Sequence, residues 1–266
     1  MIVGDLRAQL RANPLVRGLH RSATTLVRKL PPPAYGYESK PSGPYSTASA
    51  VPQERALQKW SHYALYYDRI LESLQKSRNN AALGVIEIGV LHGGSLEVLS
   101  RAVPPQSVII GVDKDPRCSQ VSIPGAAVRI GSQSDADFLT GIVKELPSLD
   151  LVIDDGSHRA KDQMASLDTL FPYLAPGGFY IIEDIHTSYM AAFGGGWRRP
   201  GTAASAAKVL IDGLHSPFHR FGWACGHRAT WSELSSITVA ESLLILEKRP
   251  SDYSCFPFLT DGEKLY

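Results

Sequence analysis

The chain has 266 residues and a net charge of +1, and 44% of its residues are hydrophobic while 20% are charged. This composition is typical of a globular protein with room for one α/β domain and an appended arm, and the near-zero charge gives no global attraction to nucleic acid or acidic lipid. Three cysteines are too few for a disulfide framework and no apolar stretch reaches membrane-spanning length, so we expect a cytoplasmic protein with no membrane span.

The first part of the chain differs from the rest in charge. Its first thirty residues carry six basic side chains against the single acid Asp5, with leucines at roughly helical spacing. Such a segment can be a transit peptide or a membrane-surface segment, but we favour a helical arm that packs on the domain or on a second subunit. Residues 31–52 are rich in Pro, Gly and Ser and indicate a linker or wrapping loop. We therefore divide the chain into a basic arm with its linker (1–53) and one folded domain (54–266).

The folded domain shows an alternation of helical and strand patterns. Alternating short apolar strands and helices predict a doubly wound, mostly parallel sheet, and two adjacent strand patterns at the end demand an antiparallel hairpin. The glycine-rich residues 185–201 predict a mobile loop. The expected helices cover 54–76, 94–102, 135–145, 160–172 and 202–214. The expected strands cover 85–89, 107–113, 126–131, 150–155 and 179–184, with the hairpin at 236–240 and 242–248.

Two of these strands end in a pair of acids. The pairs are Asp154 with Asp155 and Glu183 with Asp184, and His158 and His186 follow them. Neighbouring parallel strands lie about 5 Å apart, so the four carboxylates should crowd one edge of the sheet. Such crowding requires a cation, or one acid that stays protonated. Oxygen ligands with an open side suit Mg²⁺ or Mn²⁺, so the pattern favours a metal-assisted enzyme.

A glycine-rich turn follows the first strand, in the segment EIGVLHGGS. It places Glu87, Gly89 and Ser95 where a backbone can pass close to a ligand at a helix start. The dinucleotide fingerprint GxGxxG is absent, and the spacing resembles the first motif of S-adenosylmethionine (SAM) methyltransferases, in particular the catechol-type enzymes. Asp113, which ends the second strand, can accept hydrogen bonds from a ribose diol.

A second polar group, Gln133, Ser134 and Asp135, follows the third strand. In methyltransferases of this kind that position faces the adenine. Ser or Asp before a helix is also simply an N-cap, so this assignment has an alternative.

The two acidic motifs, IDDGSH and LFPYLAPGGFYIIEDIHTSY, resemble those of the metal-dependent sugar O-methyltransferases, over roughly residues 60–189. The resemblance implies a Rossmann-like class I methyltransferase fold with SAM as cofactor and a bound Mg²⁺. It makes Asp155, Glu183 and Asp184 the metal ligands and His158 the general base. Because side chains alternate along a strand, Asp154 is expected to face the cofactor instead, and the same division should apply within the second pair.

The resemblance also implies a small-molecule or oligosaccharide acceptor, and a homodimer or homotetramer. His186, Tyr189 and Trp197 are then the expected acceptor contacts, because aromatic faces stack on sugar rings and glycines let the loop close.

Three other interpretations remain open at this point. A catechol-type O-methyltransferase would use the same cofactor and metal on an aromatic diol. An NAD-dependent oxidoreductase has a similar fold, although the missing GxGxxG argues against it. A protein that binds a partner through a vestigial site would not need the intact acids and histidine.

Overall fold

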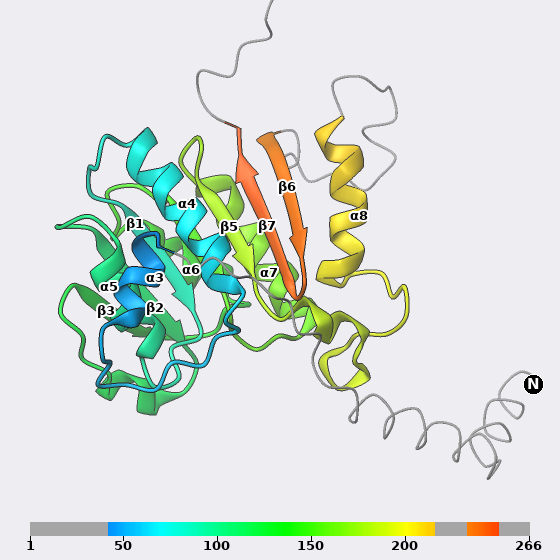
Figure 1. Ribbon diagram of the computed structural model, residues 1–266. Helices are drawn as coiled ribbons and strands as arrows, with labels where there is room; N and C mark the ends of the chain where they lie inside the picture. Colours follow the sequence, from blue (N-terminus) through cyan, green and yellow to red (C-terminus); the bar gives the residue numbers. More distant parts are fainter. Residues whose placement is uncertain (1–41, 216–232, 250–266) are drawn as a thin grey trace, which may run out of the picture. The chain divides into compact units, whose positions relative to one another are not determined.

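The structure is a computed structural model, and it describes residues 42–215 and 233–249. Its centre is a seven-stranded sheet with the strand order β3-β2-β1-β4-β5-β7-β6 (Figure 1). Each central strand is short, buried and mainly apolar, which suits a sheet covered on both faces. The strands are β1 (Gly84–Ile88), β2 (Val108–Asp113), β3 (Ala126–Ile130), β4 (Leu151–Asp154), β5 (Phe179–Ile182), β6 (Leu234–Ala240) and β7 (Leu243–Lys248).

The sheet is parallel from β3 to β5 and becomes antiparallel at the hairpin. β7 pairs antiparallel with both β5 and β6, and only Glu241 and Ser242 connect the two hairpin strands. Ser242 adopts a φ of 64°, as a tight two-residue connection requires. The predicted doubly wound sheet with a terminal antiparallel hairpin is therefore confirmed.

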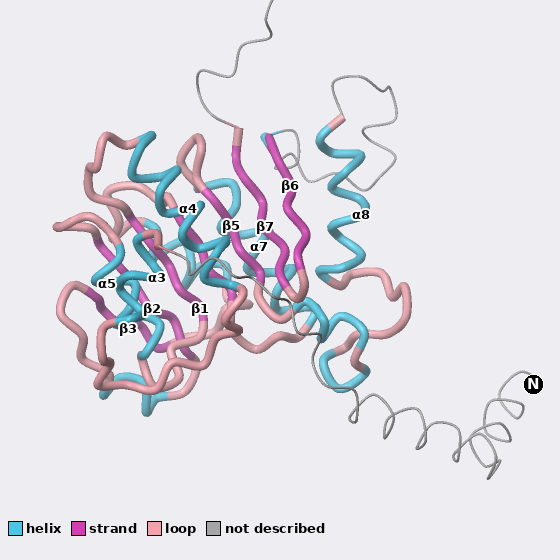
Figure 2. Tube along the Cα trace, viewed as in Figure 1, coloured by secondary structure: helices cyan, strands magenta, loops and turns pink. Residues whose placement is uncertain are grey.

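Helices cover both faces of the sheet, as the tube view also shows (Figure 2). One apolar cluster joins α3, α4 and α5 to one face, and a second joins α6, α7 and α8 to the other. The helices are α3 (Pro44–Ala50), α4 (Tyr63–Ser77), α5 (Gly94–Ala102), α6 (Ala136–Val143), α7 (Ala160–Leu170) and α8 (Ala203–Leu214). Short 3₁₀ turns are η1 (Pro116–Gln120), η2 (Phe171–Tyr173), η3 (Ile185–Tyr189) and η4 (Ala191–Phe193).

The segment that precedes the sheet differs from its prediction in two places. Helix α3 lies within the segment that was expected to be a linker. It packs on α4, because Tyr45 is buried against the Tyr67 ring and Ser46 donates hydrogen bonds to Asp68. Residues 54–62, expected to begin a long helix, are instead irregular, as are 51–53 before them, and α4 begins only at Tyr63. The predicted basic arm lies mostly outside the described residues, since the description begins at residue 42.

The irregular segment 51–62 packs against the start of α5. The backbone N–H groups of Glu54 and Arg55 donate to the Glu97 carboxylate. A Cβ added at Gly94 would lie 2.3 Å from the Ala56 carbonyl oxygen, so only glycine permits this approach. These contacts with Gly94 and Glu97 of α5 hold residues 54–56 in an irregular path.

Within residues 42–215 and 233–249, no helix has the length and apolar character needed to cross a membrane.

Candidate active site

The ends of β4 and β5 bring the predicted acids to one edge of the sheet. The two strands are parallel neighbours, with Asp154 opposite Ile182. Asp155 directly follows β4, and Glu183 and Asp184 directly follow β5. Ligands of doubly wound proteins bind at this carboxyl edge.

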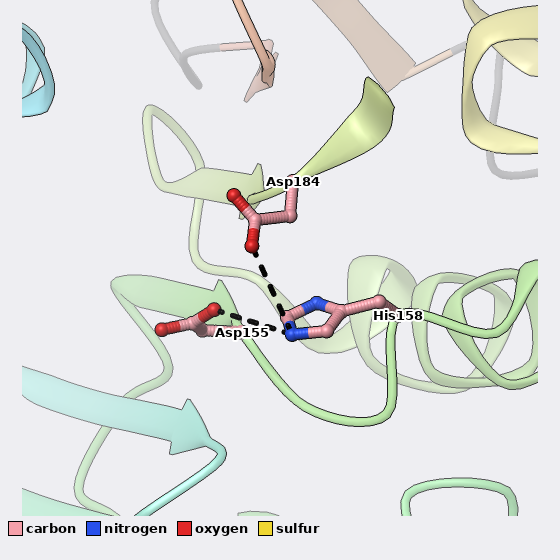
Figure 3. A group of neighbouring side chains, drawn as sticks. All are labelled: Asp155, His158 and Asp184. Atoms are coloured by element: carbon pink, nitrogen blue, oxygen red, sulfur yellow. Dashed lines mark ion pairs between the residues drawn. The ribbon is translucent and has the colours of Figure 1, made fainter. Parts of the chain in front are cut away.

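Asp155, His158 and Asp184 converge on one point, as Figure 3 shows. The His158 Nε2 atom lies 4.0 Å from Asp155 Oδ1 and 3.9 Å from Asp184 Oδ2. One potential ligand atom from each of these three side chains lies within 4.8 Å of the other two. Among the described acids, histidines and cysteines, this is the group of three that meets that distance. All three are partly exposed, so an ion and a substrate could both reach them.

The backbone at two of these residues is strained. His158 has a φ of 55° and Asp184 a φ of 52°, in the left-handed region that residues with a Cβ rarely adopt. Such a conformation costs about 1–3 kcal/mol and persists where the surroundings hold it in place. Here Thr187 holds both turns, because its hydroxyl donates to the carbonyl oxygens of His158 and Asp184. The turns aim the two side chains at each other.

Lys59, which the sequence analysis did not identify, lies among the acids. Its ammonium is 2.8 Å from Asp155 Oδ2, 2.5 Å from Glu183 Oε1 and 3.4 Å from Glu87 Oε1. The side chain is only 4% exposed. Burial lowers the pKa of Lys59, but the nearby carboxylates more than offset this and hold the pKa well above its usual value. Lys59 therefore supplies a buried positive charge to the acidic edge.

Glu183 lies beside the convergent group and is bound differently. Lys59 and the Tyr67 hydroxyl both donate to its Oε1. Burial raises the pKa of the Glu183 carboxyl, and the Lys59 charge offsets part of this rise. Glu183, a predicted metal ligand, therefore shares the Lys59 ammonium with Asp155. It lies outside the group of three side chains in Figure 3.

Asp184 is held by the start of α4. Its Oδ1 accepts from the Tyr63 hydroxyl at 3.1 Å and from Trp60 Nε1 at 3.3 Å. Both members of the second pair therefore face residues 59–67, and the alternation expected between Glu183 and Asp184 fails. The reason is the left-handed backbone at Asp184, which breaks the extended geometry on which alternation depends.

Asp154, predicted to lie at the cofactor, is buried in the core and does not line the cavity at the ends of β1, β2 and β3. It is fully buried and accepts hydrogen bonds from Gln133, Ser166 and Tyr180. Because Asp154 lies inside the strand, alternation turns it away from Asp155 and into the core beneath α7. Its visible role is to hold Gln133, whose Oε1 in turn accepts from the Ser157 backbone N–H.

This buried acid gives a pH prediction. Burial raises the pKa of Asp154 from 3.8 to about 6. Between about pH 4 and pH 6 the folded protein keeps a proton that the unfolded chain has lost, so the free energy of unfolding falls as pH rises. Asp154→Asn should remove this decline, which amounts to about 3 kcal/mol for a shift of this size. Urea unfolding of both proteins across this pH range measures it.

The matched control for Asp154→Asn is Asp137→Asn, which makes the same change at an exposed position of α6. Other buried acids titrate equally in the variant and the wild type, so their contributions cancel in the difference. A difference in stability that does not vary with pH would contradict the assignment.

A cavity of about 360 Å³ lies beside the acids, at the ends of β1, β2 and β3. Four of the residues predicted at the cofactor line it: Gly89, Asp113, Gln133 and Ser134. This volume is within the range of sites for small molecules. The remaining lining includes Lys114, Gly131 and Gly156 from the turns after the strands, and Lys161 and Asp162 from the first turn of α7.

The turn after β1 is shaped by Gly89 and Asp113. Gly89 has a φ of 99°, and a Cβ there would lie 2.1 Å from the Asp155 carbonyl oxygen. The Asp113 carboxylate accepts from the backbone N–H groups of Val90, Leu91 and Asp115. Burial opposes ionisation, but these bonds outweigh it and lower the pKa of Asp113, so an anion faces the cavity.

Three other predicted cofactor residues lie outside the cavity lining. Glu87 forms an ion pair with Lys59, whose ammonium lies 3.4 Å from Glu87 Oε1, and Ser95 lies in the first turn of α5. Asp135 caps α6 by accepting from the Phe138 backbone N–H, which is the alternative that the sequence left open.

The loop after β5 carries the predicted acceptor contacts. Tyr189 and Trp197 are 52% and 80% exposed, and their ring centroids lie 6.1 Å apart. Phe193 in the same loop packs edge-on against the His158 ring. His186 points to Ser242 of the hairpin turn and lies 4.0 Å from Asp184 Oδ1. The aromatic side chains therefore adjoin the convergent group through Phe193.

Comparison with known proteins agrees with this geometry. A family model described as a methyltransferase domain matches residues 86–185. A tetracenomycin-C glycoside enzyme of Streptomyces olivaceus, 8-demethyl-8-(2-methoxy-alpha-L-rhamnosyl)-tetracenomycin-C 3'-O-methyltransferase, is 36% identical over 64% of this chain and 44% of its own length. Mycinamicin VI 2''-O-methyltransferase of Micromonospora griseorubida is 34% identical over 56% of this chain and 38% of its own length. The chain thus spans less than half the length of these relatives.

A solved structure supports the same relationship. The MycE methyltransferase of the mycinamycin biosynthetic pathway, in complex with Mg, SAH and mycinamycin VI, matches with a TM-score of 0.62 and 29% identity, over 81% of this chain and 56% of that one. The sequence, the fold and the relatives agree: residues 86–185 match a methyltransferase domain on a class I methyltransferase fold, and the chain is similar over part of its length to sugar O-methyltransferases of glycosylated natural products.

Proposed function

We propose that the protein is a SAM-dependent, divalent-metal-dependent O-methyltransferase that methylates a sugar hydroxyl in a glycoside, oligosaccharide or glycosylated natural product. The observation that carries this proposal is the convergence of Asp155, His158 and Asp184 beside a nucleoside-sized cavity. Relatives of 34–36% identity act on sugars of natural products, which supports the choice of acceptor.

The acids at the sheet edge fit a hard divalent cation. Asp155 Oδ1 and Asp184 Oδ2 both point toward the space beside His158 Nε2. Carboxylate oxygens with an open side suit Mg²⁺ or Mn²⁺. Asp155, Asp184 and the adjoining Glu183 are the residues that would hold the ion.

The cavity fits the adenosine part of SAM. Asp113 presents an anionic carboxylate to it, as a ribose diol requires, while Gln133 and Ser134 offer polar atoms for a base. On the other side of Gly89, the Glu87 carboxylate, which is ion-paired with Lys59, and the Ser95 hydroxyl would contact the amino-acid end.

The chain's own groups then have defined tasks in the reaction. SAM supplies a methyl group on a positively charged sulfur, and the metal supplies a charge that acidifies the acceptor hydroxyl. His158 Nε2 accepts the hydroxyl proton, because it lies at the convergence of the two acids and is reached from outside. The strained turns at His158 and Asp184 hold these side chains in place before the substrate arrives.

The loop after β5 is the proposed acceptor surface. Tyr189 and Trp197 offer exposed aromatic faces, and His186 precedes them in sequence and lies close to Asp184. Aromatic faces stack on the apolar side of a sugar ring. The resemblance to sugar O-methyltransferases further supports a homodimer or homotetramer, which light scattering of the full chain would test. The cytoplasm is the proposed location.

The experiment that tests the function is methyl transfer from labelled SAM with Mg²⁺. The acceptor panel contains glycosides and free oligosaccharides, with catechols as the competing acceptor class, and each reaction is repeated with EDTA. We expect transfer to a glycoside that EDTA abolishes. Transfer only to catechols would exclude a sugar acceptor, and transfer that is indifferent to EDTA would exclude the metal.

A further inference from the structure

The three acids at the sheet edge share one feature: protein donors already occupy one oxygen of each. Lys59 takes Oδ2 of Asp155. Lys59 and Tyr67 both take Oε1 of Glu183. Tyr63 and Trp60 both take Oδ1 of Asp184. All four donors come from residues 59–67, at the end of the irregular segment and the start of α4.

In Asp155 and Asp184, the oxygen that remains faces the convergent group. Asp155 directs its Oδ1, and Asp184 its Oδ2, toward His158. Each is the partner of the oxygen that residues 59–67 hold. Each of these two carboxylates can therefore offer a single oxygen to an ion at this point.

We propose that Lys59, with Trp60, Tyr63 and Tyr67, sets the metal preference of the site by limiting each acid to single-oxygen ligation, so that the site takes Mg²⁺ or Mn²⁺ and discriminates against Ca²⁺. This inference rests on the proposed function, since it concerns the ion of the same site. Lys59 is a positioning residue here: it acts on the metal through Asp155 and Glu183.

The reason lies in how the two ions are coordinated. Ca²⁺ takes six to eight oxygens and commonly uses both oxygens of a carboxylate, whereas Mg²⁺ takes six in a strict octahedron and keeps several waters. Three single oxygens leave half of an octahedron for water and the acceptor hydroxyl. The same three leave Ca²⁺ short of protein ligands.

Residues 59–67 can hold these oxygens firmly. The Lys59 side chain is 4% exposed, and Tyr63 and Tyr67 are fully buried in the core. Upstream, the Glu97 carboxylate fixes the segment by its bonds to Glu54 and Arg55. Three of the four donors are therefore part of the packed fold, and an ion cannot displace them without opening it; the fourth, Trp60, is 52% exposed.

The test compares divalent-ion affinities by calorimetry on the full chain, without acceptor, for Mg²⁺, Mn²⁺ and Ca²⁺. In the wild type we expect Ca²⁺ to bind more weakly than Mg²⁺. Lys59→Met frees Oδ2 of Asp155, while Tyr67 still donates to Oε1 of Glu183. The ratio of the Ca²⁺ to the Mg²⁺ dissociation constant should then fall at least about fivefold. The lost positive charge affects two ions of equal charge alike, so it cancels in the ratio.

Two further proteins complete the experiment. Lys208→Met makes the same change on the exposed face of α8 and should leave the ratio unchanged. If Lys59→Met does not fold, the double variant Trp60→Phe with Tyr63→Phe frees an oxygen of Asp184 without removing a charge, and it should also lower the ratio. A ratio that stays at the wild-type value in a folded variant overturns this inference alone. A wild type that binds no divalent ion overturns the proposed function and this inference together.

Discussion

Replacing His158 with alanine should reduce methyl transfer about 10²–10⁴-fold while the affinities for SAM and Mg²⁺ stay close to those of the wild type. The imidazole is the proposed proton acceptor at the convergent point, because the two carboxylates there are the proposed ligands of the ion. Its loss removes proton transfer but leaves both carboxylates and the nucleoside-sized cavity intact. Turnover measured at saturating SAM and Mg²⁺, together with calorimetry for each ligand, checks the prediction.

The same variant separates a base from a ligand. His158 Nε2 lies close enough to the two acids to coordinate an ion itself. If it does, His158→Ala will weaken Mg²⁺ binding strongly, and excess metal will restore part of the turnover. His215→Ala at the end of α8 is the matched control, because it removes an exposed imidazole remote in sequence from the site. Unchanged turnover in His158→Ala would remove this residue from the mechanism.

The sheet and its acidic edge could be predicted because their signals are local. Each strand is a short apolar run, and the glycine-rich turns between elements set their order along the chain. Once β4 and β5 are parallel neighbours, the geometry of the sheet alone brings Asp155 and Asp184 to the same edge. The terminal hairpin follows equally from two strand patterns with almost no residues between them.

Lys59 could not be predicted, because its importance depends on contacts far away in sequence. It bonds to Asp155 and Glu183, which lie 96 and 124 residues downstream. A single lysine in a helical pattern reads as a solvent-facing charge. Its burial depends on the irregular path of residues 51–62, which Glu97 holds in place.

Asp154 and the second acidic pair show where alternation along a strand is a good guide and where it fails. Asp154 is the last residue of β4, so its side chain points away from that of Asp155, and toward the core. Alternation correctly predicted that the Asp154 and Asp155 side chains point in opposite directions. It could not predict which of the two faces the candidate site. Asp184 lies beyond the end of β5 with a left-handed backbone, and there the rule does not apply.

Replacing Asp184 with asparagine should lower the affinity for Mg²⁺ at least about 100-fold, because loss of even an indirect contact to a metal commonly costs 10–100-fold. Asparagine keeps the shape of the side chain and tolerates the left-handed backbone at this position. Its carbonyl oxygen can still accept from Tyr63 and Trp60, so the amide nitrogen takes the place of Oδ2. A neutral donor then faces the ion where an anionic oxygen stood.

Calorimetry with Mg²⁺ and thermal unfolding without metal distinguish a lost ligand from a damaged fold. The unfolding temperature of metal-free Asp184→Asn should stay close to that of the wild type, while the stabilisation that Mg²⁺ gives the wild type should disappear. Asp137→Asn removes an exposed carboxylate of α6 and should keep that stabilisation. Undiminished Mg²⁺ binding in a folded Asp184→Asn would show that the ion does not rest on this carboxylate, and the convergence of Figure 3 would then need another explanation.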